Sequence, residues 1–224
     1  MATEETDKRA AARRRNLAEG KIDFTAMYAT HDAFERDLRR FAAAIDAGRA
    51  KAPSVAAGWE SFKHQLHIHH TSEDATLWPA LRAKVTDPAS IEVLDLMESE
   101  HGQIDPLLAA VDAAYAAPGL EGLGAALEQT MQALAVHMVH EEDLALPLIE
   151  EHLTKADWNA FPRYSRKINN LSSGLEFLPW MLDEATLELY QSTMKNILPP
   201  PGRVVYRLVM LPRYRRRGYW QDAA

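Results

Sequence analysis

Two stretches of the chain repeat one spacing of histidine, acid and proline. Residues 69–79 and residues 137–147 both read His-x-x-x-Glu-acid-x-x-x-x-Pro. A lone histidine lies upstream of each stretch, at His31 and at His101. A helix advances about 100° per residue, so a His and a Glu four residues apart stack on one face. The repeat therefore predicts two helix hairpins of the same design, which constrains the fold more than any other feature.

The pattern around the repeat is helical. Gly48 provides a stop signal, and Asp87 followed by Pro88 provides an N-cap and a first helical residue. Thr154 and Asp157 resemble a capping box that opens a further short helix. Four long helices with short links predict an all-α, up-down four-helix bundle. The expected helices cover residues 23–47, 54–85, 88–117 and 122–153, and a later helix covers about 175–197, bent or interrupted at Pro179.

Three segments follow from this pattern. Residues 1–22 are polar and unpatterned, and we expect a flexible charged N-terminal arm. Residues 23–153 form the bundle. Residues 154–224 form a C-terminal extension with helical and irregular pieces and a basic aromatic tail, without evidence of an independent domain.

Cysteine is absent from the 224 residues, whereas histidine occurs nine times. That composition excludes disulfides, thiolate catalysis, iron–sulfur clusters and cysteine-type zinc sites. No apolar run is long enough to cross a bilayer, and no apolar run follows the basic N-terminal residues as a secretory signal requires. We therefore expect a cytoplasmic location and no membrane insertion. The net charge of −7 argues against nucleic acid as a general partner.

Each helix of the predicted bundle directs one histidine toward the core, and two of these helices add a glutamate. Buried carboxylates are unfavourable alone, because burial and mutual repulsion raise their pKa values. Bound cations remove both problems. We therefore predict a metal site whose ligands are His31, His69, Glu73, His101, His137 and Glu141. This set exceeds the needs of one tetrahedral zinc ion, and imidazole with carboxylate suits iron, with manganese or zinc as weaker alternatives.

These residues carry a resemblance to a known family. A His in the first helix, His-x-x-x-Glu in the second, Glu-His in the third and His-x-x-x-Glu in the fourth resemble the hemerythrin-like family, also called the HHE cation-binding domain. The resemblance covers about residues 23–153. It implies a non-heme centre of two iron ions, cycling between Fe2+ and Fe3+, with an oxo or hydroxo bridge and two bridging carboxylates. The bridges correspond to Glu73 and Glu141.

The chain departs from the oxygen-carrying members of that family, which place two histidines four residues apart on the third helix. Met97 and Asp105 occupy that spacing around His101. One ligand is missing unless another residue supplies it, and the candidates are His70, Tyr28, Glu98 and Asp105. We favour His70. An open position would suit peroxide chemistry and places reversible oxygen carriage in doubt.

Acids next to the ligands lie off the inward faces of their helices. Glu100 and Asp74 could hold imidazoles from outside, whereas a solvated face is favoured for Glu142. The remaining histidines are interpreted as structural or solvated: His64, His67, His140 and His152.

Three functions remain open. The first is binding of dioxygen, nitric oxide or peroxide in oxidative or nitrosative stress, or in oxygen or iron sensing. The second is an enzyme with catalase- or oxidase-like activity on peroxide. The third is a regulatory interaction module with a structural metal. Six arginines at 203–217 leave a nucleic-acid or anionic-membrane surface open, although a tail bound to the chain's own acidic bundle is favoured.

Overall fold

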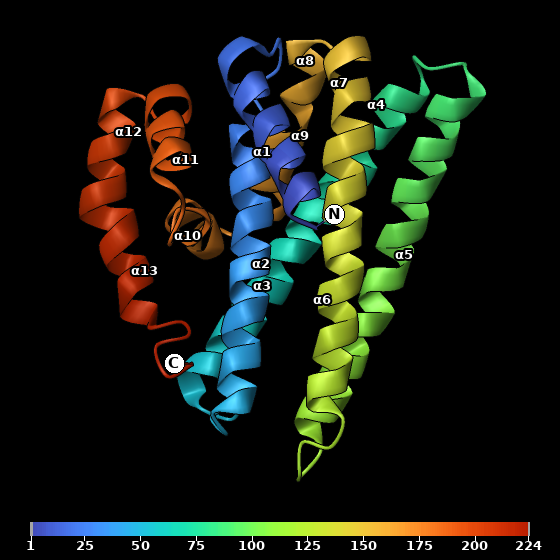
Figure 1. Cartoon of the computed structure of the whole chain (residues 1–224). Coiled ribbons are helices and arrows are strands. Elements are labelled where there is room, and N and C mark those ends of the chain that lie inside the picture. The colour runs from blue at the N-terminus through green and yellow to red at the C-terminus, as the bar shows by residue number, and fades with distance from the viewer. Residues whose placement is uncertain (1, 224) are drawn as a thin grey trace.

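The computed structural model describes residues 2–223, and its regular elements in that range are all helical. Four antiparallel rods form the bundle (Figure 1). The first and third are single helices, α2 (Thr25–Asp46) and α5 (Pro88–Ala116). The second contains α3 (Pro53–Ser72) and α4 (Trp78–Arg82), and the fourth contains α6 (Leu123–His140) and α7 (Leu146–His152). This architecture confirms the predicted all-α, up-down bundle.

Local sequence sets the ends of these rods. α2 ends just before Gly48, whose φ of 68° suits a residue without a side chain. α5 begins at Pro88, and the Asp87 carboxylate accepts a hydrogen bond from the backbone N–H of Ser90 at 2.9 Å. This contact is the predicted N-cap. The helix limits agree with the predictions to within a few residues.

The second and fourth rods each contain one π-helical turn that the sequence pattern did not predict. η1 (Glu73–Leu77) joins α3 to α4, and η2 (Glu141–Ala145) joins α6 to α7. The N–H of Trp78 donates to the carbonyl of Glu73, five residues back, and Leu146 donates to Glu141 in the same way. A proline follows each donor. Proline lacks an N–H and its ring collides with the carbonyl four residues back, so the wider turn accommodates it.

The N-terminal residues form a helix where the sequence suggested an unpatterned arm. α1 (Ala2–Glu19) lies beside α2 and near α7 (Figure 1). Asn16 ties its end to the bundle, since its amide donates to the carbonyl of Ile22 at 3.1 Å and accepts from the N–H of Phe24 at 3.3 Å. This arrangement brings Arg13 over the bundle.

The C-terminal extension is a series of short helices: α8 (Lys155–Trp158), α9 (Ala160–Ile168), α10 (Leu171–Met181), α11 (Leu187–Ser192), the π turn η3 (Thr193–Ile197), α12 (Pro200–Val205), the π turn η4 (Tyr206–Met210) and α13 (Leu211–Arg217). Thr154 and Asp157 form the predicted capping box. The single helix expected at 175–197 is wrong. α10 continues through Pro179 to Met181, and α11 starts anew where the Thr186 hydroxyl accepts from the N–H of Leu189.

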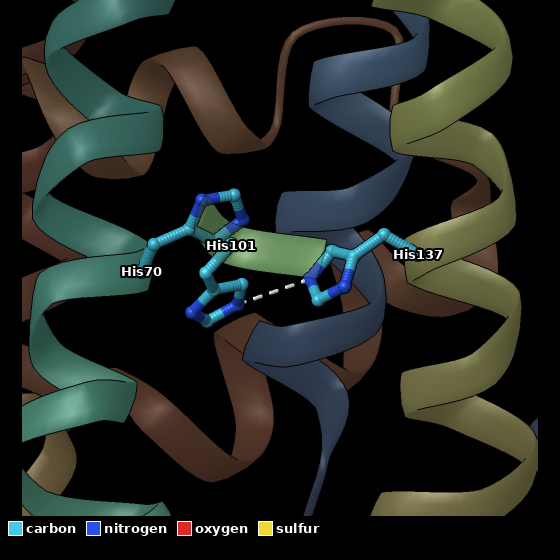
Figure 2. A group of neighbouring side chains, drawn as sticks. All are labelled: His70, His101 and His137. Atoms are coloured by element: carbon cyan, nitrogen blue, oxygen red, sulfur yellow. Dashed lines mark hydrogen bonds between the residues drawn. The ribbon is translucent and has the colours of Figure 1, made fainter. Parts of the chain in front are cut away.

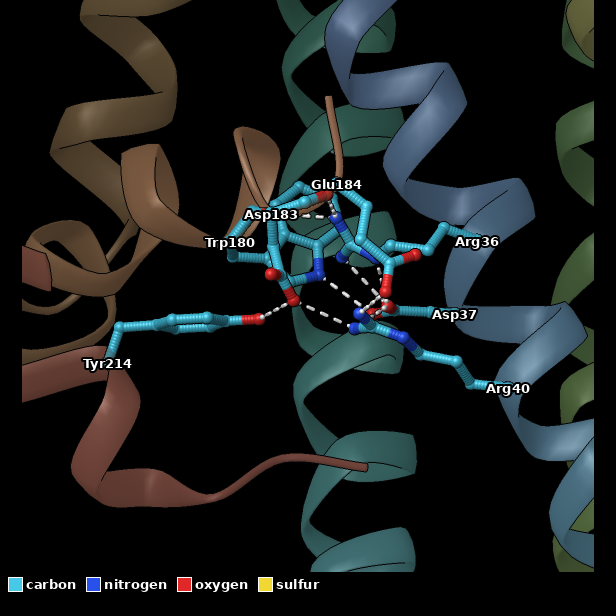
Figure 3. Close-up of polar contacts among 7 residues, drawn as sticks. All are labelled: Arg36, Asp37, Arg40, Trp180, Asp183, Glu184 and Tyr214. Carbon is cyan, nitrogen blue, oxygen red and sulfur yellow. Dashed lines mark hydrogen bonds and ion pairs between the residues drawn. The ribbon is translucent and has the colours of Figure 1, made fainter. Parts of the chain in front are cut away.

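Trp180 fastens this extension to α2. Its indole Nε1 donates to Oδ2 of Asp37 at 2.8 Å, and Arg36 donates to the Trp180 carbonyl at 2.7 Å (Figure 3). The Trp180 ring is 1% exposed and packs against Phe34. Tyr214 of α13 adds a hydrogen bond to Asp183 at 3.1 Å. The extension and the bundle therefore share one hydrophobic core.

The last residues close over the outside of α2 and α3. The Trp220 N–H donates to the Ser54 carbonyl at 3.1 Å, and the Trp220 ring covers Gly58 so closely that a Cβ there would lie 2.3 Å from it. Arg213 and Arg217 both pair with Glu176. No helix among the described residues has the length and apolar character to span a bilayer.

Candidate metal centre

All six predicted ligands lie inside the bundle, and all four rods contribute. Each of the six residues is at most 9% exposed: His31, His69, Glu73, His101, His137 and Glu141. The helical periodicity places them there, because each occupies the apolar stripe of its own rod. Phe34 packs edge-on against the His69 ring, and Phe62 packs against Phe34, so this side of the centre is apolar and buried.

The ligand atoms form three overlapping groups, each with all its atoms within 4.8 Å of one another. One group is His31, His69 and Glu141; the second is His69, His70 and Glu73; the third is His70, His101 and His137. Figure 2 shows the third, in which three rings from three rods converge. The chain of overlapping groups is long enough for more than one cation.

Buried atoms without a hydrogen bond concentrate at this place. They include Nε2 of His31 and of His69, and both carboxylate oxygens of Glu73 and of Glu141. Oε2 of Glu141 lies 3.0 Å from Nε2 of His31, a separation typical of two atoms that share one ion at about 2.1 Å. Leaving six such atoms unsatisfied in a dry core costs several kcal/mol. A cation satisfies all of them, so the donor set fits a metal.

Three imidazoles are held from behind by carboxylates. Nδ1 of His31 lies 2.7 Å from Oε1 of Glu142, Nδ1 of His101 lies 2.8 Å from Oδ1 of Asp74, and Nδ1 of His137 lies 3.1 Å from Oε2 of Glu100. A carboxylate accepts a hydrogen bond from the Nδ1–H of a neutral imidazole, and the lone pair of that ring is then on Nε2. All three Nε2 atoms therefore face the centre. Those of His101 and His137 lie 3.2 Å apart, and each Nε2 can offer its lone pair to a metal once the metal displaces the proton there.

The two hairpins exchange these contacts. His31 of the first hairpin meets Glu141 and Glu142 of the second, at 3.0 and 2.7 Å. His101 of the second meets Glu73 and Asp74 of the first, at 3.6 and 2.8 Å. The internal repeat is thus a structural pseudo-symmetry in which each half supplies two adjacent acids to the first ligand histidine of the other half, His31 or His101.

Glu142 corrects a prediction. Rotation along an ideal helix favoured a solvated face for this residue, yet its side chain is 2% exposed. The π turn that begins at Glu141 changes the rotation, and α1 covers the outside. Arg13 donates through Nε to Oε2 of Glu142 at 2.8 Å and through Nη2 to Oε1 at 2.6 Å. Residues 1–22 show no pattern in the sequence, and no spacing there links Arg13 to the site.

The charges of the centre call for a cation. Burial and the neighbouring charge of Glu141 raise the pKa of Glu73 well above its usual range. Burial alone would lower the pKa of His31, but Glu141 and Glu142 raise it to about 9. Burial lowers the pKa of His69 well below its usual range. Without a metal, the site takes up protons on His31 and Glu73, and a cation would replace them.

The four additional ligand candidates have different positions. His70 belongs to two of the three groups, and its ring stacks on His101 with centroids 4.1 Å apart. Tyr28 is buried one turn away beneath the Arg13 guanidinium. Glu98 reaches out to Arg82 at 3.0 Å, and Asp105 is exposed. Among the described residues, the structure therefore brings His70 to the centre and leaves the other three outside these groups.

A groove of about 460 Å³ leads from the surface to one end of the centre. His70 and His101 form its inner wall, and Leu66, Ile104 and Leu108 supply apolar surface. Asp74, Glu98 and Asp105 line it as well. The opposite end of the centre, at His31, is covered by Arg13 and Glu142. A small molecule from solvent therefore reaches the His70 and His101 side first.

A helical bundle with this buried cluster of imidazoles and carboxylates defines a metal-binding protein of the non-thiolate class. Comparison with family models agrees, since the model described as the hemerythrin HHE cation binding domain matches residues 23–149, more than half of the chain. The chain belongs to that family. Comparison with curated proteins and with solved structures gives no match. The centre is thus a metal-binding site with histidine and glutamate ligands.

Proposed function

We propose that this protein is a non-heme di-iron protein that binds dioxygen, nitric oxide or peroxide in the cytoplasm. The observation that carries the proposal is the set of orphaned donor atoms, which spans two overlapping groups around two glutamates. His31, His69, His101 and His137 would be terminal ligands, and Glu73 and Glu141 would bridge the ions. Iron bound there would supply redox chemistry and an exchangeable coordination position.

The residues around the centre support small, uncharged ligands. The apolar side chains of the groove favour a neutral molecule, and its three acids disfavour an approaching anion. The carboxylates behind His31, His101 and His137 hold the rings in one orientation, so the centre is organised before a ligand arrives. These features fit oxidative or nitrosative stress handling, or sensing of oxygen or iron.

Decomposition of peroxide is the second candidate. It is favoured by the position of His70, whose imidazole forms the wall between groove and centre without a carboxylate partner at hydrogen-bond distance among the described residues. Burial and the neighbouring imidazoles lower the pKa of His70 well below its usual range. A neutral imidazole can accept a proton from a peroxide that enters the groove. His70 is also our preferred extra ligand, and the two roles are separable.

Elemental analysis and the optical spectrum test the proposal. We expect two iron ions per chain after loading with ferrous iron, and a spectral change when the reduced protein meets dioxygen or nitric oxide. Glu73→Gln and Glu141→Gln should each lower the iron content, whereas Glu92→Gln, a change at an exposed position of α5 outside the cluster, should leave it unaltered. A protein that retains zinc or manganese in preference to iron would contradict the iron assignment. Oxygen release on addition of peroxide would favour the enzymatic alternative.

A further inference from the structure

The helical segment from α12 to α13 has two apolar faces instead of one. Tyr206, Met210 and Tyr214 point inward and are 3%, 7% and 7% exposed. Their neighbours Val204, Val205, Leu208 and Val209 point to solvent and are 55%, 45%, 72% and 48% exposed. We call these four residues the outward apolar face. The fold accounts for the inward residues, which pack into the common core, but it gives the outward face no partner among the described residues.

The spacing makes the outward apolar face continuous. Val204 and Leu208 are four residues apart, as are Val205 and Val209, so the four side chains adjoin on one surface. Half of the exposed large hydrophobic residues of the described chain belong to this segment of two helical turns. Isolated exposed apolar residues are ordinary, whereas a contiguous group at helical spacing marks a contact surface.

Positive charge surrounds this face. Arg207, Arg215 and Arg216 are exposed and make no ion pair within the part of the chain that the structure describes. No aspartate or glutamate occurs between Glu188 and Asp222. The segment is therefore cationic although the whole chain carries a net charge of −7. Figure 1 shows α12 and α13 at the outer edge of the molecule, with one side free of other elements.

We propose that the outward apolar face and its arginines bind the surface of an anionic phospholipid membrane. A helix with exposed aliphatic side chains and flanking arginines lies in the interface, with the apolar side chains among the acyl chains and the guanidinium groups at the phosphates. The proposal concerns binding in the plane of the membrane, and it needs no membrane-spanning helix. It does not rest on the metal centre or on its chemistry.

Two other occupants fit the surface less well. A second copy of the chain would bring the arginines of both copies together, and like charges at an apolar contact oppose association. A nucleic acid would meet the arginines, but four aliphatic side chains offer no ring for base stacking, and they gain nothing from a phosphate backbone. A lipid surface satisfies both components at once, which is why the observations favour it.

Sedimentation of the full-length protein with vesicles tests the proposal. The probes are vesicles of phosphatidylcholine alone and of phosphatidylcholine mixed with phosphatidylglycerol. We expect binding to the mixed vesicles only, and weaker binding as salt rises. Val204→Ser/Leu208→Ser removes apolar surface without touching the core, and Val136→Ser is a control at a similarly exposed position of α6. The double variant should bind at least about fivefold more weakly, and the control should bind as the wild type does.

A second pair of variants separates the charge from the apolar surface. Arg207→Gln/Arg216→Gln should weaken binding to the mixed vesicles by about tenfold at low salt. Arg39→Gln/Arg49→Gln makes the same change of net charge on another part of the surface and should bind normally. Equal loss in both double variants would overturn the proposal, since it would show a response to net charge alone.

Other results would also overturn it. The proposal fails if the wild type binds no vesicles at low salt. It also fails if Val204→Ser/Leu208→Ser binds the mixed vesicles as tightly as the wild type does. Self-association that Leu208→Ser abolishes, in a protein that binds no vesicles, would overturn the proposal as well. It would identify a second copy of the chain as the occupant of the outward apolar face. Tighter binding of a short DNA duplex than of mixed vesicles, unchanged by Leu208→Ser, would identify a nucleic-acid surface instead. Circular dichroism melting of each variant shows that the fold is retained.

Discussion

Arg13 and Glu142 form a two-pronged ion pair, with Nε of Arg13 2.8 Å from one carboxylate oxygen of Glu142 and Nη2 2.6 Å from the other. Through Glu142 this pair orients His31, a metal ligand in our proposal. An N-terminal helix outside the family's matched region thereby influences the centre. Contacts therefore run from Arg13 through Glu142 to His31 at the metal site. Arg13 can be substituted without altering a predicted metal ligand.

Arg13→Met should weaken metal binding about tenfold or more, because Glu142 then loses its hydrogen bonds from Arg13 and holds His31 less firmly. It should also lower the free energy of unfolding of the metal-free protein by about 2–3 kcal/mol, since the buried Glu142 loses its guanidinium and keeps the protonated His31 as a neighbouring cation. Competition with a chelator and a urea titration measure the two effects. Arg14→Met, an exposed neighbour on α1, is the control. Arg13→Lys should have effects between those of the wild type and Arg13→Met, because lysine keeps the charge but cannot form the bidentate pair with Glu142.

His70→Ala should identify the role of the undecided histidine. If His70 is a metal ligand, iron content falls after dialysis against a chelator. If it acts only on a molecule in the groove, iron content stays at the wild-type level and peroxide turnover falls instead. We expect the loss of iron, because His70 lies in two of the three ligand groups. His67→Ala, on the same groove and exposed, should retain iron.

Binding of metal should stabilise the fold strongly. At a metal concentration about one hundred times the dissociation constant, the free energy of unfolding should rise by about 2.7 kcal/mol for each independent site. The physical reason is the relief of the six orphaned atoms between the hairpins. Differential scanning calorimetry with and without chelator measures the shift. The shift should vanish in Glu73→Gln/Glu141→Gln, and a shift of wild-type size in that variant would contradict the ligand assignment.

Arg36→Met should destabilise the protein by about 3 kcal/mol, because the buried Asp37 loses its hydrogen-bonded guanidinium and the neighbouring Arg40 lies 3.8 Å away, beyond hydrogen-bond distance. Arg36 is 4% exposed and joins Asp37 to the carbonyls of Trp180 and Asp183 (Figure 3). Arg39→Met removes an exposed arginine from the same helix, whose ion pair with Glu35 spans 3.7 Å. That control should change the free energy of unfolding by less than about 0.5 kcal/mol in a chemical denaturation series.

Gly58→Ala should loosen the C-terminal end by displacing the Trp220 ring, since the new Cβ would lie 2.3 Å from it. We expect a loss of about 1–3 kcal/mol and an increase in the accessibility of Trp220 to a fluorescence quencher. Gly174→Ala is the matched control, because nothing lies within 4 Å of its added Cβ. In an exposed helical position that change should stabilise the protein by about 0.5–1 kcal/mol.

Helical periodicity was enough to predict the bundle and the burial of the histidines and glutamates. It works because a ligand must share the face that packs into the core, and that face is visible as an apolar stripe around His31 or His137. The capping residues Asp87 and Thr154 were also predictable, since a cap depends on neighbours only three residues away.

Contacts between distant segments were not predictable in this way. Arg13 and Glu142 are separated by most of the chain, and their pairing depends on how α1 docks. The position of Glu142 depends in addition on a π turn, and a wheel drawn for an ideal helix misplaces residues beyond such a turn. The available signal was the proline that follows each π turn of the second and fourth rods, at Pro79 and Pro147.

Because the two hairpins contact each other reciprocally at the centre, the complete centre exists only where they meet, and neither hairpin contains it alone. Among the described residues, the carboxylates that contact His31 belong to the second hairpin, and those that contact His101 belong to the first. We therefore expect a fragment with one hairpin to carry ligands but no assembled centre, and two complementary fragments to rebuild the centre when they dock. Metal content should consequently report on folding, because we expect an ion to be retained after both halves have closed around it.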